Sequence, residues 1–221
     1  MRWDDADWQA WRPAEAAERL RGIDVPWCVA AGWSIDLFVG RERRDHEDLE
    51  IAIPAHRFDD VAAAFGDLEW YAPTGDEQLA AVAEDRGRLR KTHQTWGLDV
   101  PAKAWRIDVF REPTDGDAWV CRRDERIRLR YDELIERSAT GIPFVRPEVA
   151  LLFKAKAARP KDEDDLAAVL PLLDATRRRL LRDWLELVHP GHTWLAHLVG
   201  VPGTPPVPGT SGRYQPPPSP A

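Results

Sequence analysis

The sequence predicts an α/β protein of the α+β type, in which a mixed β-sheet with flanking helices precedes a helical subdomain. Short apolar or alternating segments interleave with helical segments up to about residue 140. After Pro143 the pattern is helical to about residue 199, and from Val201 the chain is rich in Pro, Gly, Ser and Thr. Such a composition buries too little apolar surface to order a segment. We therefore expect an α/β domain over 1–140, a helical subdomain over 141–199 and a disordered Pro-rich tail over 200–221.

The first half contains clear local signals. Residues 25–31 (VPWCVAA) form a short apolar run typical of a buried strand, and Gly32 interrupts it. WSIDLFVG then predicts a short helix that stops at Gly40. The segments 48–54 (DLEIAIP) and 104–110 (AWRIDVF) alternate apolar and polar residues, which is the period-two pattern of a strand.

The remaining segments follow from weaker patterns. We expect a short helix over 77–84 (EQLAAVAE), an edge strand near 91–96, and two strands of a meander in WVCRR and RIRLRY. The helical half is expected to break near Pro160 and around Asp174.

Composition and charge narrow the function classes. The chain has 31 basic and 38 acidic residues, a net charge of −7, which disfavours nucleic acid as the main ligand and is compatible with a cationic small molecule. No apolar run approaches the roughly 18 residues of a membrane span, and the start lacks a signal-peptide pattern, so we expect a cytoplasmic protein. Cys28 and Cys121 are expected to be buried free thiols rather than a disulfide or a zinc site.

Two carboxylates share one face of a predicted strand. Asp48 and Glu50 are two residues apart, opposite a face made of Leu49, Ile51 and Ile53. If the strand that carries Asp108 lies alongside, three carboxylates form an oxygen-rich site suited to magnesium. Such ions bridge the phosphates in phosphoryl-type transfer. Taken alone, the alternation also fits a solvated strand face.

The residues upstream favour the functional interpretation. A glycine turn that opens a helix presents backbone N–H groups to phosphate, and Gly32 precedes the acidic strand by fewer than 20 residues. A phosphate turn and metal ligands this close together predict a nucleoside triphosphate site.

The stretch WCVAAGWSIDLFVGRERRDHEDLEIAI resembles the signature of the aminoglycoside nucleotidyltransferase-like family, in the nucleotidyltransferase superfamily with its polymerase-beta-like fold. Further pieces match in order: RIDVF, W-x-x-RRD, PEVALLFKAKAARPKDEDDL and HPGHTWL. The resemblance thus covers most of residues 25–198. It implies a nucleotidyltransferase fold, Mg²⁺, ATP or another nucleoside triphosphate as co-substrate, and adenylyl transfer to a hydroxyl of a small, aminoglycoside-like acceptor.

The resemblance also implies roles for individual positions. Asp48, Glu50 and Asp108 stand at the metal ligands, and Asp108 also stands where a base could act on the acceptor hydroxyl. The positions implied to form the phosphate turn, the polar part of the motif and the nucleotide cleft are Gly32, Trp33, Asp36, Arg41, Arg44, His46, Lys154, Lys161 and Asp162. For His46 a structural hydrogen bond is an equal alternative.

Two positions depart from the family pattern. Ala31 replaces the first glycine of the turn, and Glu50 replaces an aspartate. An added Cβ can narrow the approach of phosphates, and a longer carboxylate can displace a metal. The alternative is therefore a catalytically weakened nucleotide-binding relative without transferase activity. A toxin-type enzyme that modifies a macromolecule is a third hypothesis, which the acidic charge disfavours.

Other polar clusters have mainly structural interpretations. His189 and His192 are expected to form a capping turn after the last long helix rather than a zinc site. The segment Arg122–Asp124 is expected to be a structural ion-pair cluster, with acceptor contact as the alternative.

Overall fold

A mixed sheet forms the framework of the molecule. The computed structural model describes residues 6–73 and 79–198. Its nine-stranded sheet has the order β11-β12-β2-β3-β7-β6-β4-β5, and β1 pairs with β7. The strands of this sheet are β1 (Asp7–Trp8), β2 (Cys28–Val29), β3 (Glu50–Pro54), β4 (Glu69–Pro73), β5 (Leu79–Ala81), β6 (Gln94–Asp99), β7 (Ala104–Glu112), β11 (Ile135–Arg137) and β12 (Pro143–Val145). A separate three-stranded sheet contains β8 (Thr114–Asp115), β9 (Ala118–Val120) and β10 (Arg128–Arg130), so the predicted meander is confirmed.

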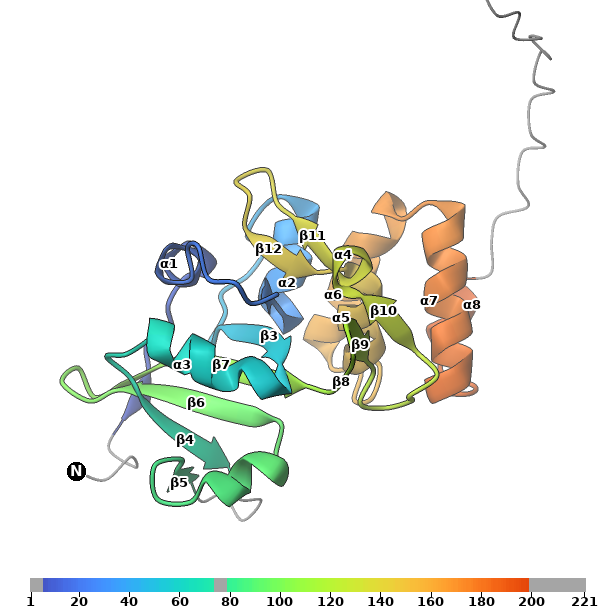
Figure 1. Cartoon of the computed structure of the whole chain (residues 1–221). Helices are drawn as coiled ribbons and strands as arrows, with labels where there is room; N and C mark the ends of the chain where they lie inside the picture. Colours follow the sequence, from blue (N-terminus) through green and yellow to red (C-terminus); the bar gives the residue numbers. More distant parts are fainter. Residues whose placement is uncertain (1–5, 74–78, 199–221) are drawn as a thin grey trace, which may run out of the picture.

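Helices flank the sheet and dominate the C-terminal part. The α-helices are α1 (Pro13–Arg19), α2 (Ala31–Val39), α3 (Phe58–Ala64), α4 (Tyr131–Leu134), α5 (Pro147–Lys154), α6 (Pro160–Val169), α7 (Ala175–Val188) and α8 (Leu195–Leu198). Short 3-10 helices are η2 (Ala55–Arg57), η3 (Arg86–Arg90) and η4 (Leu170–Leu172). Figure 1 shows α5 to α8 gathered on one side, away from β4, β5 and β6. The predicted breaks are confirmed, because Pro160 opens α6 and Asp174 caps α7 through Arg177 N at 2.8 Å.

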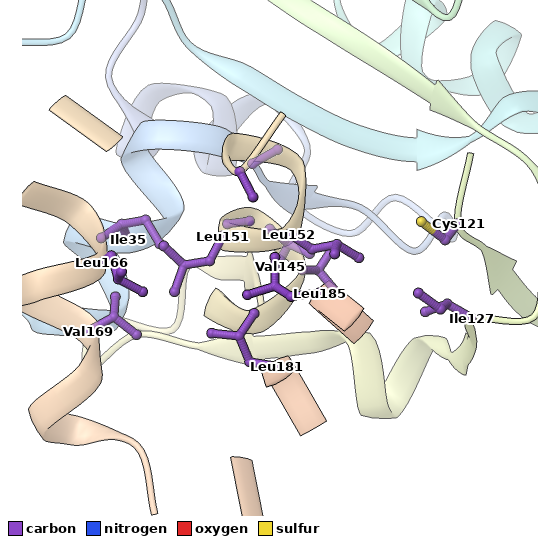
Figure 2. Packing of buried hydrophobic residues seen from close by; sticks show 14 of the residues in the cluster. Ile35, Cys121, Ile127, Val145, Leu151, Leu152, Leu166, Val169, Leu181 and Leu185 are labelled. Carbon is purple, nitrogen blue, oxygen red and sulfur yellow. The ribbon is translucent and has the colours of Figure 1, made fainter. Parts of the chain in front are cut away.

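Two hydrophobic cores hold these layers together. One core lies against α1 and α3 and receives Ile51 and Val109 from the sheet. The other lies against the C-terminal helices and receives Ile35 from α2. Figure 2 shows side chains of this second core: Ile35, Val145, Leu151, Leu152, Leu166, Val169, Leu181 and Leu185. Because α2 contributes to both cores, its N-terminus is fixed relative to the sheet and to α5.

The central strand pair has the register that brings the carboxylates together. β3 and β7 are parallel, with Glu50 beside Asp108 and Ala52 beside Phe110. Residues between these positions, such as Ile51 and Val109, enter the core on the opposite face. The strand alternation predicted from the sequence is therefore confirmed, although β3 begins at Glu50 rather than at residue 48.

Two local predictions were wrong. Within the segment 77–84, Leu79–Ala81 form strand β5, which pairs antiparallel with β4; residues 77 and 78 lie outside the described part. Pairing with β4 has overridden the helix-forming composition of this segment. The strand expected at an edge near residues 91–96 is β6, which lies between β7 and β4.

The remaining predictions concern the cysteines, membrane-spanning helices and the domain boundaries. Cys28 and Cys121 are both free and buried, as expected. In the described ranges, no helix has the length and apolarity needed to cross a membrane. The predicted tail over 200–221 lies outside the described residues. The division at residue 140 stays a prediction, and β12, which belongs to the main sheet, follows it at Pro143–Val145.

Candidate functional site

A cavity of about 710 Å³ lies between the β2-β3-β7 part of the sheet and helix α5. Its walls also include the N-terminal end of α2, the loop that leads into β3 and the first turn of α6. The charged and imidazole side chains that line it are Arg44, Asp45, His46, Glu47, Asp48, Glu50, His93, Glu112, Arg122, Arg123, Lys154, Lys156, Arg159, Lys161 and Asp162. Most of the positions predicted from the sequence therefore line one cavity.

The first turn of α2 has an unusual backbone. Ala31 adopts a φ of +47°, the left-handed region that glycine enters most readily. At Gly32, an added Cβ would lie 2.5 Å from Nη2 of Arg44 and 2.8 Å from Nδ1 of His46. Gly32 is thus required because two side chains of the predicted motif pack against it.

The three predicted carboxylates differ in their exposure. Asp48 and Glu50 line the cavity and are half-buried, whereas Asp108 is 3% exposed and does not line it. Asp108 Oδ2 accepts a hydrogen bond from Nε2 of Gln94 at 2.6 Å, and its Oδ1 is buried without a partner. Asp108 therefore lies beside Glu50 in register, with one oxygen held by Gln94.

Burial and mutual repulsion shift the pKa values of this pair. Burial, with the charges of Asp48 and Asp108, raises the pKa of Glu50 to about 8, and Lys154 acts in the opposite direction. Burial raises the pKa of Asp108 to about 7, against the hydrogen bond from Gln94. Two buried carboxylates this close repel each other, so a proton on one of them or a cation between them stabilises the pair.

The carboxylates fit a divalent cation in donor chemistry. They are hard oxygen ligands on adjacent strands, and the buried Oδ1 of Asp108 has no other partner. Within the described residues, however, no three His, Cys, Asp or Glu side chains are grouped closely enough to hold a metal as they stand. The ligand set predicted from the sequence, Asp48, Glu50 and Asp108, thus stays a prediction.

A buried ion-pair network connects the predicted motif to the C-terminal helices. His46 Nε2 donates to Oδ2 of Asp36 at 2.8 Å, and Arg43 Nε donates to Oδ1 of the same carboxylate at 2.8 Å. Arg43 also pairs with Asp165 of α6, which lies 2.9 Å from Nζ of Lys154. His46 thus makes a structural hydrogen bond, and its predicted contact with the nucleotide stays a prediction. Burial lowers the pKa of the imidazole.

The predicted lysines differ in their partners. Lys154 lies between Asp165 and Asp162, with its Nζ 3.0 Å from Oδ1 of Asp162, and its side chain is 8% exposed. Arg159 binds the other oxygen of Asp162 at 2.9 Å. Lys161 lines the cavity, and no carboxylate of the described residues pairs with it. Lys161 is thus the more available of the two lysines for an anionic ligand.

Of the predicted positions, Trp33, Asp36, Arg41 and Asp108 lie outside the cavity wall. Trp33 is 8% exposed, stacks on the imidazole of His46 at 4.2 Å and joins the core around α1. Arg41 is exposed and does not line the cavity. Trp33 could act on a ligand only through His46, and its predicted nucleotide-binding role stays a prediction.

Sequence patterns did not predict the contacts at the other end of the cavity. Here Arg122 Nε binds Oε1 of Glu112 at 3.0 Å, and Arg123 Nη2 donates to the carbonyl of Phe153 at 3.0 Å. The expected ion-pair cluster of Arg122–Asp124 is therefore wrong in its pairing, because Asp124 pairs with Arg126. His93 had no sequence signal, since it lies in the segment with the weakest pattern.

His189 and His192 form the expected turn. His189 caps the end of α7, and Nε2 of His192 hydrogen-bonds to the carbonyl of Ala155 at 2.9 Å. The turn therefore fixes the end of α7 against the segment that follows α5.

Comparisons with known proteins bear on the fold and on the N-terminal part of the chain. Residues 14–89 match a family model described as aminoglycoside-2''-adenylyltransferase. A comparison with curated proteins gave no significant match. Among solved structures, the antibiotic-resistance factor ANT(2'')-Ia matches with a TM-score of 0.51 and 14% identity, over 79% of this chain and 88% of that one. The lincosamide antibiotic adenylyltransferase LnuA, with lincomycin bound, matches with a TM-score of 0.51 and 13% identity, over 72% of this chain and 95% of that one.

At these identities the solved structures establish the fold, and the matching segment establishes the resemblance. That segment contains the turn at Gly32, the Arg44–His46 loop and strand β3. Residues 14–89 thus match the aminoglycoside-2''-adenylyltransferase family model, and the chain has the nucleotidyltransferase fold.

Proposed function

We propose that this chain is a metal-dependent nucleotidyltransferase that moves AMP from ATP to a hydroxyl of a small molecule. The observation that carries the proposal is the single cavity that joins the Gly32 turn, the carboxylates at the start of β3 and the basic side chains of α5 and α6. A triphosphate needs positive charge and backbone donors, and its transfer needs carboxylates nearby. Adenylyl transfer is also the activity that names the matching family.

The proposed reaction assigns a role to each group of residues. The acceptor oxygen forms a bond to the α-phosphorus, the bond to the bridging oxygen breaks, and pyrophosphate leaves with its electron pair. The hydroxyl proton passes to a carboxylate, for which the unpartnered Oδ1 of Asp108 is the proposed acceptor. Gly32 and Lys161 bind the phosphates, and the side chains of Arg44 and His46 pack against Gly32.

Asp48, Glu50 and Asp108 would hold the magnesium ion. When bound, such an ion neutralises phosphate charge and polarises the reacting phosphorus. Nε2 of Gln94 donates a hydrogen bond to Oδ2 of Asp108 at 2.6 Å. We propose that the Gln94 side chain must turn away before Asp108 contacts a ligand.

Calorimetric titration of ATP, with and without Mg²⁺, tests the proposal directly. We expect binding that requires Mg²⁺ and that falls at least about tenfold in Asp48→Asn, because a charged oxygen ligand is replaced by a neutral amide. The matched control is Glu47→Gln, which removes one negative charge from the same loop at a position between His46 and Asp48. Transfer is then followed as pyrophosphate release with a panel of hydroxylated acceptors.

The control separates ligation from general electrostatics. Equal losses in both variants would show that the loop acts only through its charge, which would contradict the assignment of Asp48. ATP binding that is indifferent to Mg²⁺ and to Asp48 would overturn the proposed site.

Two observations favour a second candidate, a nucleotide-binding relative without transferase activity. Ala31 is strained at φ +47°, and Glu50 is one methylene longer than the aspartate of the family pattern. This candidate predicts MgATP binding without pyrophosphate release. It also predicts that turnover appears in the double variant Ala31→Gly, Glu50→Asp; absence of turnover in that variant would remove the reason for this candidate.

A further inference from the structure

The far end of the cavity carries an excess of positive charge. We define this distal end by His93, Phe110, Glu112, Arg122, Arg123, Phe153 and Lys156, all of which line the cavity. Glu112 is four residues beyond Asp108 on β7, roughly 13 Å away at the rise of an extended strand. At that separation, Glu112 and the arginine that pairs with it can bind a part of the reactant other than the part at the carboxylates.

Only one carboxylate offsets the cations of the distal end. Arg122 Nε is 3.0 Å from Oε1 of Glu112, a buried carboxylate that also accepts a hydrogen bond from Nε1 of Trp119 at 3.2 Å. Among the described residues, no carboxylate pairs with Arg123 or Lys156. Neutral acceptors hold Arg123 instead: the carbonyl of Phe153, and Nε2 of His189 at 3.4 Å.

The two arginines are fixed against one aromatic ring. The guanidinium of Arg122 lies 4.8 Å from the ring centre of Phe153, and that of Arg123 lies 4.9 Å from it. Two like charges are thus both held against the same ring at the cavity wall. Arginine in a fixed orientation is well suited to carboxylate and phosphate groups, because its planar fork matches their oxygens.

The effect of this charge on neighbouring groups agrees with the geometry. Burial, followed by the charges of Arg122, Arg111 and Arg123, lowers the pKa of His93 to about 4. Burial and Arg122 also lower the pKa of Arg123. A bound anion would relieve the repulsion that these shifts report.

The order of the strands separates the two ends of the cavity. The Gly32 turn follows β2 on one side of the β3-β7 pair, and His93 precedes β6 on the other side. A triphosphate at the Gly32 turn therefore leaves the distal end free for the second reactant. This arrangement does not suit the cationic acceptor that the net charge had suggested.

We propose that the distal end binds an anionic group, a carboxylate or a phosphate, on the hydroxylated acceptor. The identification of the anion as part of the acceptor rests on the proposed function, whereas the presence of an anion site does not depend on that function. Arg123 supplies the main contact, Lys156 adds charge from the cavity rim, and Glu112 orients Arg122.

Ligand-observed NMR and calorimetry on the full chain test the proposal with four hexoses that differ mainly in their charge. The probes are glucose, glucosamine, glucuronate and glucose 6-phosphate, with inorganic phosphate and MgATP titrated separately. We expect the two anionic hexoses to bind at least about tenfold more tightly than glucose, and glucosamine to bind no more tightly than glucose. Arg123→Gln should weaken the anionic hexoses about tenfold and change MgATP affinity by less than about twofold.

Two further variants keep the test independent of folding. Lys156→Gln changes an exposed side chain and should weaken the anionic hexoses about threefold. Arg123→Lys retains the charge but not the planar fork, so it should weaken them by less than Arg123→Gln does. Lys161→Gln is the reciprocal variant, which should weaken MgATP and leave the anionic hexoses unchanged.

Each result bears on a different claim. Anionic hexoses that bind no better than glucose would overturn the anion site, as would a preference for glucosamine. Loss of MgATP rather than of the hexoses in Arg123→Gln would overturn the assignment to the acceptor and give the distal end to the nucleotide. If MgATP fails to bind while the Arg123-dependent anion binding persists, the proposed function fails and the anion site stands.

Discussion

Replacement of Ala31 by glycine should stabilise this protein. Ala31 has a φ of +47°, where the Cβ of an L-residue crowds its own backbone at a cost of about 1–2 kcal/mol. Glycine removes that cost but gains freedom in the unfolded chain, which takes back about 0.4–1 kcal/mol. The net expectation for Ala31→Gly is therefore a gain of about 0.5–1 kcal/mol in the free energy of unfolding.

Chemical and thermal unfolding measure this gain. For a chain of this size, about 0.5–1 kcal/mol corresponds to a rise of about 1–4 °C in Tm. The matched control is Ala30→Gly, one residue earlier, where φ is −117° and glycine offers no relief. Ala30 is 5% exposed, so the control should lose stability through unfolded-state entropy and lost burial.

The comparison of the two variants decides the argument. Stability of Ala31→Gly equal to or below that of wild type would show that the backbone strain inferred from φ is absent in solution. A stabilising effect of Ala30→Gly of the same size would point to a general preference of this turn for glycine, which contradicts the positional argument.

Three further predictions concern Gly32 and two buried ion-pair networks. Gly32→Ala should destabilise by about 1–3 kcal/mol in urea unfolding, because the new Cβ would lie 2.8 Å from the buried His46 ring; an unchanged midpoint would contradict this close contact. Asp165→Asn should cost about 3 kcal/mol by the same assay, since it leaves the buried ammonium of Lys154 short of a partner, and a neutral result would show that the network contributes little. Burial would raise the pKa of Glu148, but hydrogen bonds from two arginines outweigh it and hold the pKa at about 2. Because this pKa is depressed, Glu148 stabilises the fold above pH 4.5, and roughly 3 kcal/mol should be lost as the pH falls to 2; Glu148→Gln should flatten that acid limb.

The central strands could be predicted because their pattern is local. Alternation over 48–54 and 104–110 assigns each side chain to a face, and parallel pairing then brings Glu50 beside Asp108. The same argument placed Ile51 and Val109 in the core. The exposure of Asp108 could not be predicted this way, because it depends on Gln94, a residue of the adjacent strand.

Other parts of the site depend on contacts that sequence patterns do not reveal. Arg43 pairs with Asp165, which is 122 residues away along the chain. A signal for Asp165 did exist, since it is three residues after Asp162 and three-residue spacing shares a helix face. His93 had none, because its position at the cavity follows from the pairing of β6 with β7. The segment 77–84 misled for a related reason: pairing with β4 outweighed its helical composition.

The two departures from the family pattern are physically coupled. The backbone N–H of Ala30 donates to the backbone carbonyl of Glu50 at 2.8 Å, so the residue before Ala31 is held directly to the backbone that carries the Glu50 side chain. A turn displaced by an alanine changes where phosphates lie, and a longer carboxylate can extend toward the new position. We therefore expect Ala31→Gly and Glu50→Asp to be non-additive in MgATP affinity, with a coupling above about 0.5 kcal/mol in a double-mutant cycle. If the two effects simply add, Ala31 and Glu50 act independently on MgATP affinity, which would contradict the coupling.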